Sequence, residues 1–167
     1  MSNASIVVRD ALPSDVATVR EFNRRLALET EGLNLDGEVL HQGVLAVLQD
    51  PVKGRYFLAE EGGRVVGQTM ITFEWSDWRG GWIWWIQSVY VAMEARRRGV
   101  FRGIHSHILN QAKASADVRG VRLYVDQHNH AAQDVYSALG LTRTGYLFFE
   151  RLFQPPSNPG RFDAEGF

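Results

Sequence analysis

Two stretches near the start of the chain carry apolar residues at the spacing of an amphipathic helix. In residues 15–30 these are Val16, Val19, Phe22 and Leu26, with charged residues between them. A polar, glycine-containing loop at 31–37 follows, and a second apolar pattern covers residues 39–48. Pro51 ends this pattern, because the residue before a proline is pushed out of the helical conformation. The pattern predicts two helices that follow a short strand at residues 6–8.

The middle of the chain is rich in strand-forming residues. Residues 56–59 and 64–73 are strand-like and are joined across Gly62 and Gly63, which predicts a hairpin. A third strand is predicted at 82–91. A helical pattern at 99–117 leads to a strand at 121–125, a short helix at 129–139 and a final hairpin at 142–153.

The predicted order is therefore β-α-α-β-β-β-α-β-α-β-β. This order favours an α/β (α+β) fold with a mixed, mostly antiparallel central sheet flanked by helices. A chain of 167 residues is the length of one domain, so we expect a single domain over 1–167. Residues 154–167, with three prolines and two glycines, form an irregular tail in this prediction.

Composition narrows the range of functions. Hydrophobic residues make up 45% and charged residues 22%, as in soluble globular proteins. The net charge of -1 gives no general attraction to nucleic acid, so no nucleic-acid partner is expected. The absence of cysteine excludes disulfides, thiolate catalysis and cysteine-based zinc sites. The first ten residues lack a signal-peptide pattern, and every apolar run is far shorter than the ~20 residues that span a bilayer. A cytoplasmic protein without a membrane partner is the expectation.

Residues 85–109 contain the most informative pattern. An apolar strand enters a basic turn containing Gly99, and the turn opens an amphipathic helix. The first turn of a helix has unpaired N–H groups and a positive dipole end, and a glycine there lets the backbone approach a phosphate closely. The spacing matches neither a Walker loop nor a dinucleotide-binding turn. The pattern predicts an anion site, with a plain basic helix start as the alternative.

At this turn the chain resembles the GNAT superfamily of N-acetyltransferases, whose pyrophosphate-binding pattern is Gln/Arg-x-x-Gly-x-Gly/Ala. Arg96 and Gly99 match this pattern, and Phe101 departs from the small residue at its last position. Residues 129–141 are similar to the family signature Asn-x-x-Ala-x-x-x-Tyr-x-x-x-Gly-Phe/Leu, through Asn129, Ala132, Tyr136, Gly140 and Leu141. The resemblance covers roughly residues 6–153. It implies a transferase that moves an acetyl group from acetyl-CoA to a primary amine of a small molecule or peptide.

The resemblance also implies where acetyl-CoA binds. The expected contacts lie on the strand before the turn, on the turn itself and on the second motif. They are Val89, Tyr90, Val91, Arg96, Arg97, Arg98, Gly99, Val100, Phe101, Arg102, Gly103, Asn129, Ala132 and Tyr136. Asn129 at the start of its helix is also suited to capping, and the two roles are compatible.

Tyr136 occupies the general-acid position of the family. A phenol has an ordinary pKa near ~10, so it is protonated at neutral pH and can donate to the departing thiolate. The alternative is a core aromatic residue. Many relatives carry a glutamate base where this chain has Gln87, and an amide cannot take a proton at neutral pH. Gln87 can still hold a water that relays the proton, so both residues are predicted to be catalytic.

The acceptor side is less well defined by the sequence. Glu29 and Glu31 precede a loop that borders the acceptor pocket in relatives, although solvated carboxylates are the alternative. The five tryptophans lie between residues 75 and 85. Among them, Trp78 and Trp85 are predicted to form an aromatic wall for the acceptor, with hairpin packing as the alternative.

Three further expectations concern metals, rival functions and assembly. The five histidines show no ligand spacing, so no metal is expected. Gln87 and Phe101 motivate one rival, a non-catalytic acyl-CoA-binding domain, and a protein N-terminal or lysine acetyltransferase is another. Because relatives are frequently dimers, the resemblance implies a homodimer.

Overall fold

The computed structural model describes residues 5–153. In chain order its elements are β1 (Ile6–Asp10), the 3-10 turn η1 (Pro13–Asp15), α1 (Val16–Glu31), α2 (Gly37–Gln49), β2 (Arg55–Glu61), β3 (Arg64–Ser76), β4 (Gly81–Val91), the 3-10 turn η2 (Met93–Ala95), α3 (Val100–Ala114), β5 (Val118–Arg122) and α4 (His130–Ala138). The sequence pattern therefore predicted the type and order of the elements as far as α4.

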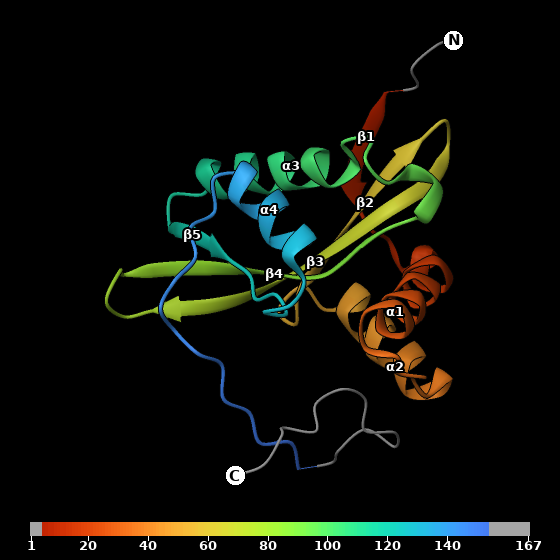
Figure 1. Ribbon diagram of the computed structural model, residues 1–167, viewed down its shortest axis with the longest axis horizontal. Coiled ribbons are helices and arrows are strands. Elements are labelled where there is room, and N and C mark those ends of the chain that lie inside the picture. The colour runs from red at the N-terminus through yellow and green to blue at the C-terminus, as the bar shows by residue number, and fades with distance from the viewer. Residues whose placement is uncertain (1–4, 154–167) are drawn as a thin grey trace.

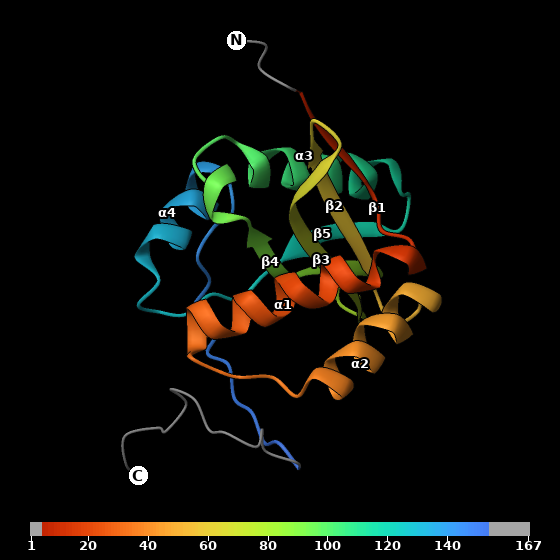
Figure 2. The ribbon, with the colours of Figure 1, turned by 90° about the vertical axis from the view of Figure 1, so that its right-hand side faces the viewer.

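The strands form one five-stranded sheet in the order β1-β2-β3-β4-β5. Neighbouring strands from β1 to β4 are antiparallel, whereas β4 and β5 are parallel. Helix α3 covers one face of the sheet, and α1 and α2 cover the other, as Figures 1 and 2 show from two directions. The expected mixed, mostly antiparallel sheet flanked by helices is confirmed.

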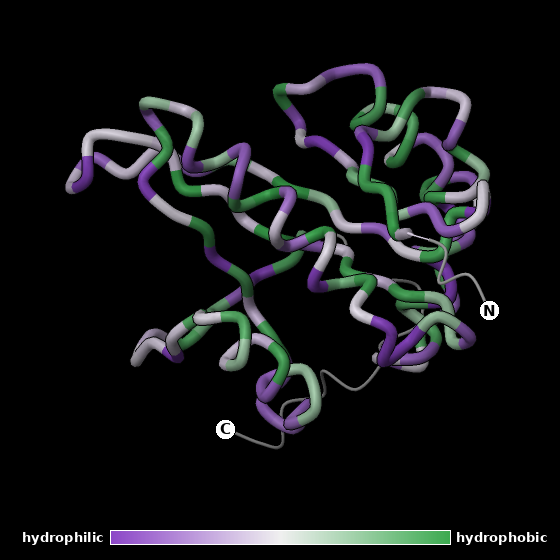
Figure 3. Tube along the Cα trace, turned by 90° about the horizontal axis from the view of Figure 1, so that it is seen from above, coloured by the Kyte–Doolittle hydropathy of each residue, from purple (hydrophilic) through white to green (hydrophobic). Residues whose placement is uncertain are grey.

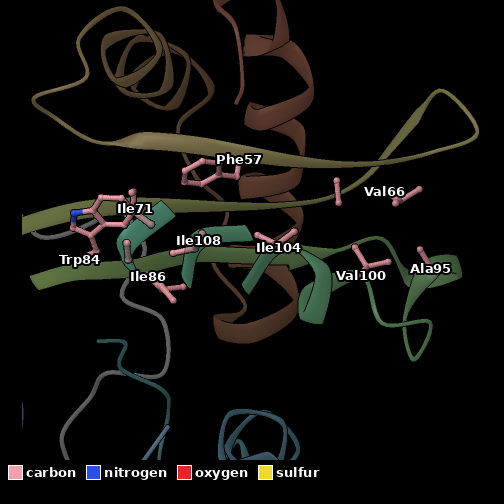
Figure 4. Close-up of a cluster of buried hydrophobic side chains, with 11 residues drawn as sticks. Phe57, Val66, Ile71, Trp84, Ile86, Ala95, Val100, Ile104 and Ile108 are labelled. Carbon is pink, nitrogen blue, oxygen red and sulfur yellow. The ribbon is translucent and has the colours of Figure 1, made fainter. Parts of the chain in front are cut away.

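The larger core lies between α3 and the sheet (Figure 4). It is made of aliphatic and aromatic side chains from β2, β3, β4 and α3, among them Phe57, Ile71, Ile86, Ile104 and Ile108. The helix packs directly on the backbone of β3 at Gly67, where an added Cβ would lie 2.7 Å from the Val100 Cγ1 atom. A residue with a side chain at position 67 would therefore push α3 off the sheet.

A second core lies under α1 and α2 and contains Val19, Val44, Tyr56 and Leu58. Asp36 caps α2 by accepting hydrogen bonds from the N–H groups of Glu38 and Val39. In Figure 3, hydrophobic and hydrophilic positions are interleaved along the helical turns, as expected of helices that bury one face. No helix within residues 5–153 is long and apolar enough to cross a membrane.

Two predictions from the sequence need correction. Strand β5 begins at Val118 rather than at residue 121, because it pairs with the first residues of β4, from Trp82 to Trp85. The predicted hairpin at 142–153 is wrong, since these residues form no strand and pair with no part of the described chain. Strand-forming side chains make a strand only where a partner backbone is available. The predicted tail at 154–167 lies outside the described residues.

Candidate active site

The second half of β4 has an open edge on the side of β5. Strand β5 pairs with β4 only from Trp82 to Trp85, and from Ile86 to Val91 the described residues place no strand on that side. On the other side β3 stays paired as far as Val91. The backbone groups of this half of β4 can therefore pair with an extended ligand as they would with another strand.

A β-bulge accompanies this opening. Gln68 pairs with Tyr90 and Met70 pairs with Gln87, so Thr69 alone lies opposite both Ser88 and Val89. Ser88 has a φ of 50°, in the left-handed region that a residue with a Cβ rarely adopts. A bulge bends its strand and increases the local twist, which accounts for the separation of β4 from β5.

A buried polar network lies beneath the bulge. The Gln68 amide nitrogen donates to Asn23 Oδ1 at 2.6 Å, and the Asn23 amide nitrogen donates to the Tyr56 hydroxyl at 2.9 Å. Burial raises the pKa of Tyr56, and hydrogen bonds from Asn23 and Ser88 oppose this effect. The network thus joins α1, β2 and β3 to the strained residue Ser88. Such a connected buried network fixes one backbone arrangement.

The turn before α3 is suited to bind an anion. Gly99 is the N-cap of α3 with a φ of 83°, and no atom lies within 4 Å of the position where its Cβ would be. The first helical hydrogen bond runs from the Gly103 N–H to the Gly99 carbonyl at 2.9 Å. The N–H groups of residues 100–102 are therefore left without a partner in the helix. Together with the positive end of the helix dipole, these groups are suited to hold phosphate oxygens.

The arginines of the turn are not equivalent. Arg96 donates to Glu29 and, at 2.9 Å, to the Val91 carbonyl, while Arg98 is paired with Glu61. Arg97 and Arg102 are exposed and have no ion-pair partner within residues 5–153. Two of the predicted arginine side chains therefore have structural partners, and two are available to an anion. Gly103, whose N–H is used inside the helix, faces Ile6 of β1 instead.

Helix α4 places Tyr136 beside this turn. The Asn129 side chain accepts a hydrogen bond from the Ala132 N–H at 3.1 Å, which confirms the predicted N-cap. The rings of Tyr136 and Phe101 meet edge to face with centroids 5.7 Å apart. Phe101, the residue that departs from the family pattern, therefore packs against the predicted acid. Burial raises the pKa of Tyr136, so its hydroxyl stays protonated across the neutral range.

Glu29 and Glu31, the two carboxylates predicted on the acceptor side, have different surroundings in the structure. Glu29 accepts a hydrogen bond from the Tyr90 hydroxyl at 2.9 Å and is paired with Arg96. Burial opposes ionisation of Glu29, but these two donors outweigh it and hold its pKa below the ordinary value. Glu31 has a raised pKa, because it is partly buried and because Asp126 adds a like charge. A carboxylate with a raised pKa is the better proton acceptor, so Glu31 is the one of the two to test as a base.

Gln87 and Trp85 lie two residues apart on β4, and the side chains of both are bonded to residues of β3. The Gln87 amide donates to the Thr72 hydroxyl at 2.5 Å, which fixes its orientation. The Trp85 indole N–H donates to Glu74 at 2.5 Å, and its ring lies 6.3 Å from that of Tyr124. Arg122 also donates to Glu74, at 2.9 Å, and its guanidinium lies over the Trp85 ring, 5.8 Å from the ring centroid.

Trp78 is not brought to this site. It lies in the turn between β3 and β4, where Ser76 pairs with Gly81, and the bulge at Ser88 is seven residues further along β4. At about 3.3 Å per strand residue this is roughly 23 Å. The sequence predicted both Trp78 and Trp85 on the acceptor side, whereas the strand register places Trp85 three residues from the bulge and leaves Trp78 far from it.

Sequence reasoning missed Ser88, Tyr56, Asn23 and Gln68, which shape the opening. Their contacts span 33 and 45 residues of chain, and a buried amide or phenol has no distinctive local pattern. It also missed Tyr124, which extends the aromatic surface from Trp85. No group of three or more potential ligands in the described part of the chain could hold a metal ion.

Comparison with known proteins identifies the family. The model of the acetyltransferase (GNAT) family matches residues 21–141. The chain belongs to the GNAT family. A possible acetyltransferase from Clostridium difficile 630 is 41% identical, with 90% of this chain and 99% of that one covered at a TM-score of 0.83. A search of curated proteins gives no match.

Two more distant structures share the fold. A predicted acetyltransferase from Clostridium acetobutylicum, solved with acetyl-CoA, is 19% identical with a TM-score of 0.72, covering 88% of this GNAT chain and 96% of its own. The aminoglycoside N-acetyltransferase AAC(6')-Iy, solved with CoA, is 16% identical with a TM-score of 0.74, covering 90% and 97% respectively. At these identities the likeness concerns the fold alone.

Proposed function

We propose that this GNAT chain is an N-acetyltransferase that uses acetyl-CoA to acetylate a primary amine of a small molecule or peptide. One observation carries the proposal: the open edge of β4 and the helix N-terminus at α3 follow each other directly along the chain. The open edge of β4 at residues 86–91 leads through η2 directly to the unpaired N–H groups after Gly99. A ligand with an extended amide-bearing arm and a pyrophosphate matches both parts at once.

The residues present fit acetyl-CoA. When bound, it supplies an acetyl group activated as a thioester. The backbone of Val89, Tyr90 and Val91 would pair with its extended arm, and the first turn of α3 would hold its phosphates. Arg97 and Arg102 add the charge, because their guanidinium groups are not engaged elsewhere in the described chain.

We assign the proton movements to two residues, Tyr136 and Glu31. The Tyr136 hydroxyl holds its proton at neutral pH and gives it up as the thiolate departs. Glu31, with its raised pKa, takes the proton released by the amine, directly or through water. Gln87 keeps the orientation set by Thr72 and positions such a water.

The cofactor site is tested by calorimetric titration of acetyl-CoA into the full chain and into Gly99→Glu. The glutamate places a negative charge at the anion site and strains a left-handed backbone position. Gly80→Glu is the matched control, since Gly80 has a similar φ of 56° and open space around it at the far end of β4. We expect binding to be lost only in Gly99→Glu. A folded wild-type chain that does not bind acetyl-CoA would refute the proposal.

Turnover is tested next with a panel of small amines and peptides, by following the release of free CoA. Release with an amine establishes the transferase and separates small-molecule from peptide acceptors. Tight acetyl-CoA binding without turnover of any amine would instead favour the non-catalytic acyl-CoA-binding domain.

A further inference from the structure

One end of the sheet face that carries α1 and α2 is not covered by a helix. Figure 1 shows α1 and α2 below the right-hand end of the sheet, whereas only the segment after α4 passes below the left-hand end. Thr72, Trp85 and Arg122 are register partners on β3, β4 and β5, so their side chains share a face. Their neighbours Trp84 and Val121 pack in the core under α3. Because strand side chains alternate, the three register partners lie on the uncovered face.

Aromatic rings form an exposed surface on this face. The rings of Trp85 and Tyr124 have centroids 6.3 Å apart and are tilted by 50°. Phe148 stacks on Tyr124 with centroids 5.5 Å apart. Tyr124 is nevertheless 59% exposed and Phe148 70% exposed, so the rings keep much of their area open. An open surface of adjacent rings is suited to bind another flat apolar group.

The charges around Trp85 favour a neutral ring over a cation at this surface. The guanidinium of Arg122 lies over the Trp85 ring, 5.8 Å from its centroid, so the protein itself supplies the cation for this ring. Glu74 accepts hydrogen bonds from the Trp85 indole N–H at 2.5 Å and from Arg122 at 2.9 Å. The positive charge is therefore already balanced, and a second cation over Trp85 would lie beside Arg122.

Negative charge gathers next to the rings instead. Burial raises the pKa of Tyr124, and the charges of Glu31 and Glu150 add to this effect, so both carboxylates lie within electrostatic reach of the Tyr124 hydroxyl. Asp126 in turn acts on Glu31. Glu31 has no ion-pair or hydrogen-bond partner within residues 5–153. An ammonium group is therefore attracted to the border of the aromatic surface, a few atoms away from a ring bound on it.

This border lies close to the open edge of β4. Trp85 is three residues before the bulge at Ser88, which is about 10 Å along a strand. Gln87 lies between them, points to the same face as Trp85, and has its amide fixed by Thr72. A ring bound on Trp85 and Tyr124 would therefore hold an amine near the bulge if the linker between them is short.

We propose that the acceptor is a small arylalkylamine, whose aromatic ring packs on Trp85 and Tyr124 and whose primary amine is joined to the ring by a short carbon linker. This inference rests on the proposed acetyl transfer and narrows its acceptor. The amine nitrogen forms a bond to the acetyl carbon, and the carbon–sulfur bond of the thioester breaks. One proton leaves the nitrogen and one is taken up by the departing thiolate, so the products are the N-acetyl amine and free CoA.

The test compares four amines by kcat/KM, from the release of free CoA with the full chain. 2-Phenylethylamine should exceed butylamine by about tenfold or more, because its ring buries more apolar surface. It should exceed 2-cyclohexylethylamine by about threefold to tenfold, because the two have similar size and only the phenyl ring forms aromatic pairs. 1,4-Diaminobutane, with a second cation in place of the ring, should be no better than butylamine.

Three variants test the role of the rings. Tyr124→Ala should lower the ratio of kcat/KM for 2-phenylethylamine over butylamine by about tenfold. Tyr124→Phe keeps the ring and should keep the wild-type ratio. Trp78→Ala is the matched control, because it removes an aromatic side chain that is 84% exposed and far from the bulge. Acetyl-CoA titration of each variant reports separately on folding and on the cofactor site.

Failure of the transferase itself is recognised separately. If no amine releases CoA, the proposed function fails, and 2-phenylethylamine is then titrated by calorimetry into the chain saturated with CoA. Binding that weakens about tenfold in Tyr124→Ala but not in Trp78→Ala would uphold the ring site without turnover. The absence of binding would overturn it.

If amines do release CoA, four results would overturn the inference and leave the transferase intact. Equal kcat/KM for 2-phenylethylamine and butylamine would show that the rings do not hold the acceptor. Equal values for the phenyl and cyclohexyl amines would show selection for bulk alone. A preference for 1,4-diaminobutane would assign a cation to this surface. A ratio unchanged in Tyr124→Ala would place the ring of the acceptor elsewhere.

Discussion

The two motifs that link this chain to the GNAT family are held by the fold in different ways. Helix α3, after the first motif, buries Val100, Ile104, His105, Ile108 and Ala112. Helix α4, which carries the second motif, has no fully buried residue and only partly buries Tyr136, and the segment that follows is exposed. A phosphate site benefits from a backbone fixed in advance, because it binds by preorganised N–H groups. Helix α4, which carries the predicted acid, is held by its cap and by Phe101, so its position depends more on a ligand or a partner.

The largest expected effect tests how firmly each helix is anchored. Ile104→Ala should lower the free energy of unfolding by about 2–5 kcal/mol, because Ile104 is fully buried and its loss leaves a cavity. Val135→Ala on α4, where the valine is about half exposed, should cost within roughly 0.5 kcal/mol. Urea denaturation measures both. Equal costs would show that α4 is packed as firmly as α3.

The next effect separates cofactor binding from chemistry. Tyr136→Phe removes only a hydroxyl, so kcat should fall by about 100-fold or more while the affinity for acetyl-CoA is unchanged. Since burial raises the pKa of Tyr136, the wild-type rate should decline only at pH values above the ordinary phenol range of about 10. Tyr146→Phe, at an exposed tyrosine, is the control and should behave as wild type. Weaker acetyl-CoA binding in Tyr136→Phe would instead indicate a structural role.

A smaller effect concerns Glu31. The negative charge of Asp126, a residue that shortly precedes α4, contributes to the raised pKa of Glu31. Glu31 can accept a proton only in its deprotonated form, which predominates above its pKa. Because this pKa is raised, the wild-type kcat/KM should fall as the pH drops through it, above the ordinary range of a glutamate. Glu31→Gln should lower kcat/KM by about tenfold or more and abolish this acidic limb. Glu38→Gln, on the exposed side of α2, provides the comparison. An acidic limb that persists in Glu31→Gln would assign the base to another group.

The smallest effect distinguishes the arginines of the first motif. Arg97→Ala should weaken acetyl-CoA binding by about threefold to fivefold, which corresponds to the free energy of one exposed ion pair. The loss should be smaller at high salt, because salt screens such a pair. Arg98→Ala should change it less, because Arg98 is already paired with Glu61. Calorimetry at two salt concentrations measures both. A larger loss in Arg98→Ala would mean that the pair with Glu61 opens when the ligand binds.

Local sequence patterns predicted those parts of the molecule whose structure depends on residues close together in the sequence. The turn at Gly99, the cap at Asn129 and the helices on either side follow from short-range backbone chemistry. The roles of the individual charges could not be predicted in this way. Arg96 and Arg97 are adjacent and alike in sequence, yet only Arg96 lies next to Glu29, a residue 67 positions away. The assignment of the chain to a single cytoplasmic domain stays a prediction from composition.

By itself, the sequence determined the order of elements up to α4, the glycine-containing turn before α3 and the membership of the family. Each of these depends on side-chain periodicity, glycine conformation and spacing along the chain. Only the tertiary structure decided that β4 bulges at Ser88, that Glu29 is paired with Arg96 while burial and Asp126 raise the pKa of Glu31, and that residues 142–153 form no hairpin. Those outcomes depend on strand register and on groups brought together from distant parts of the chain. Register and burial are set by the packing of the whole sheet, which no local pattern contains.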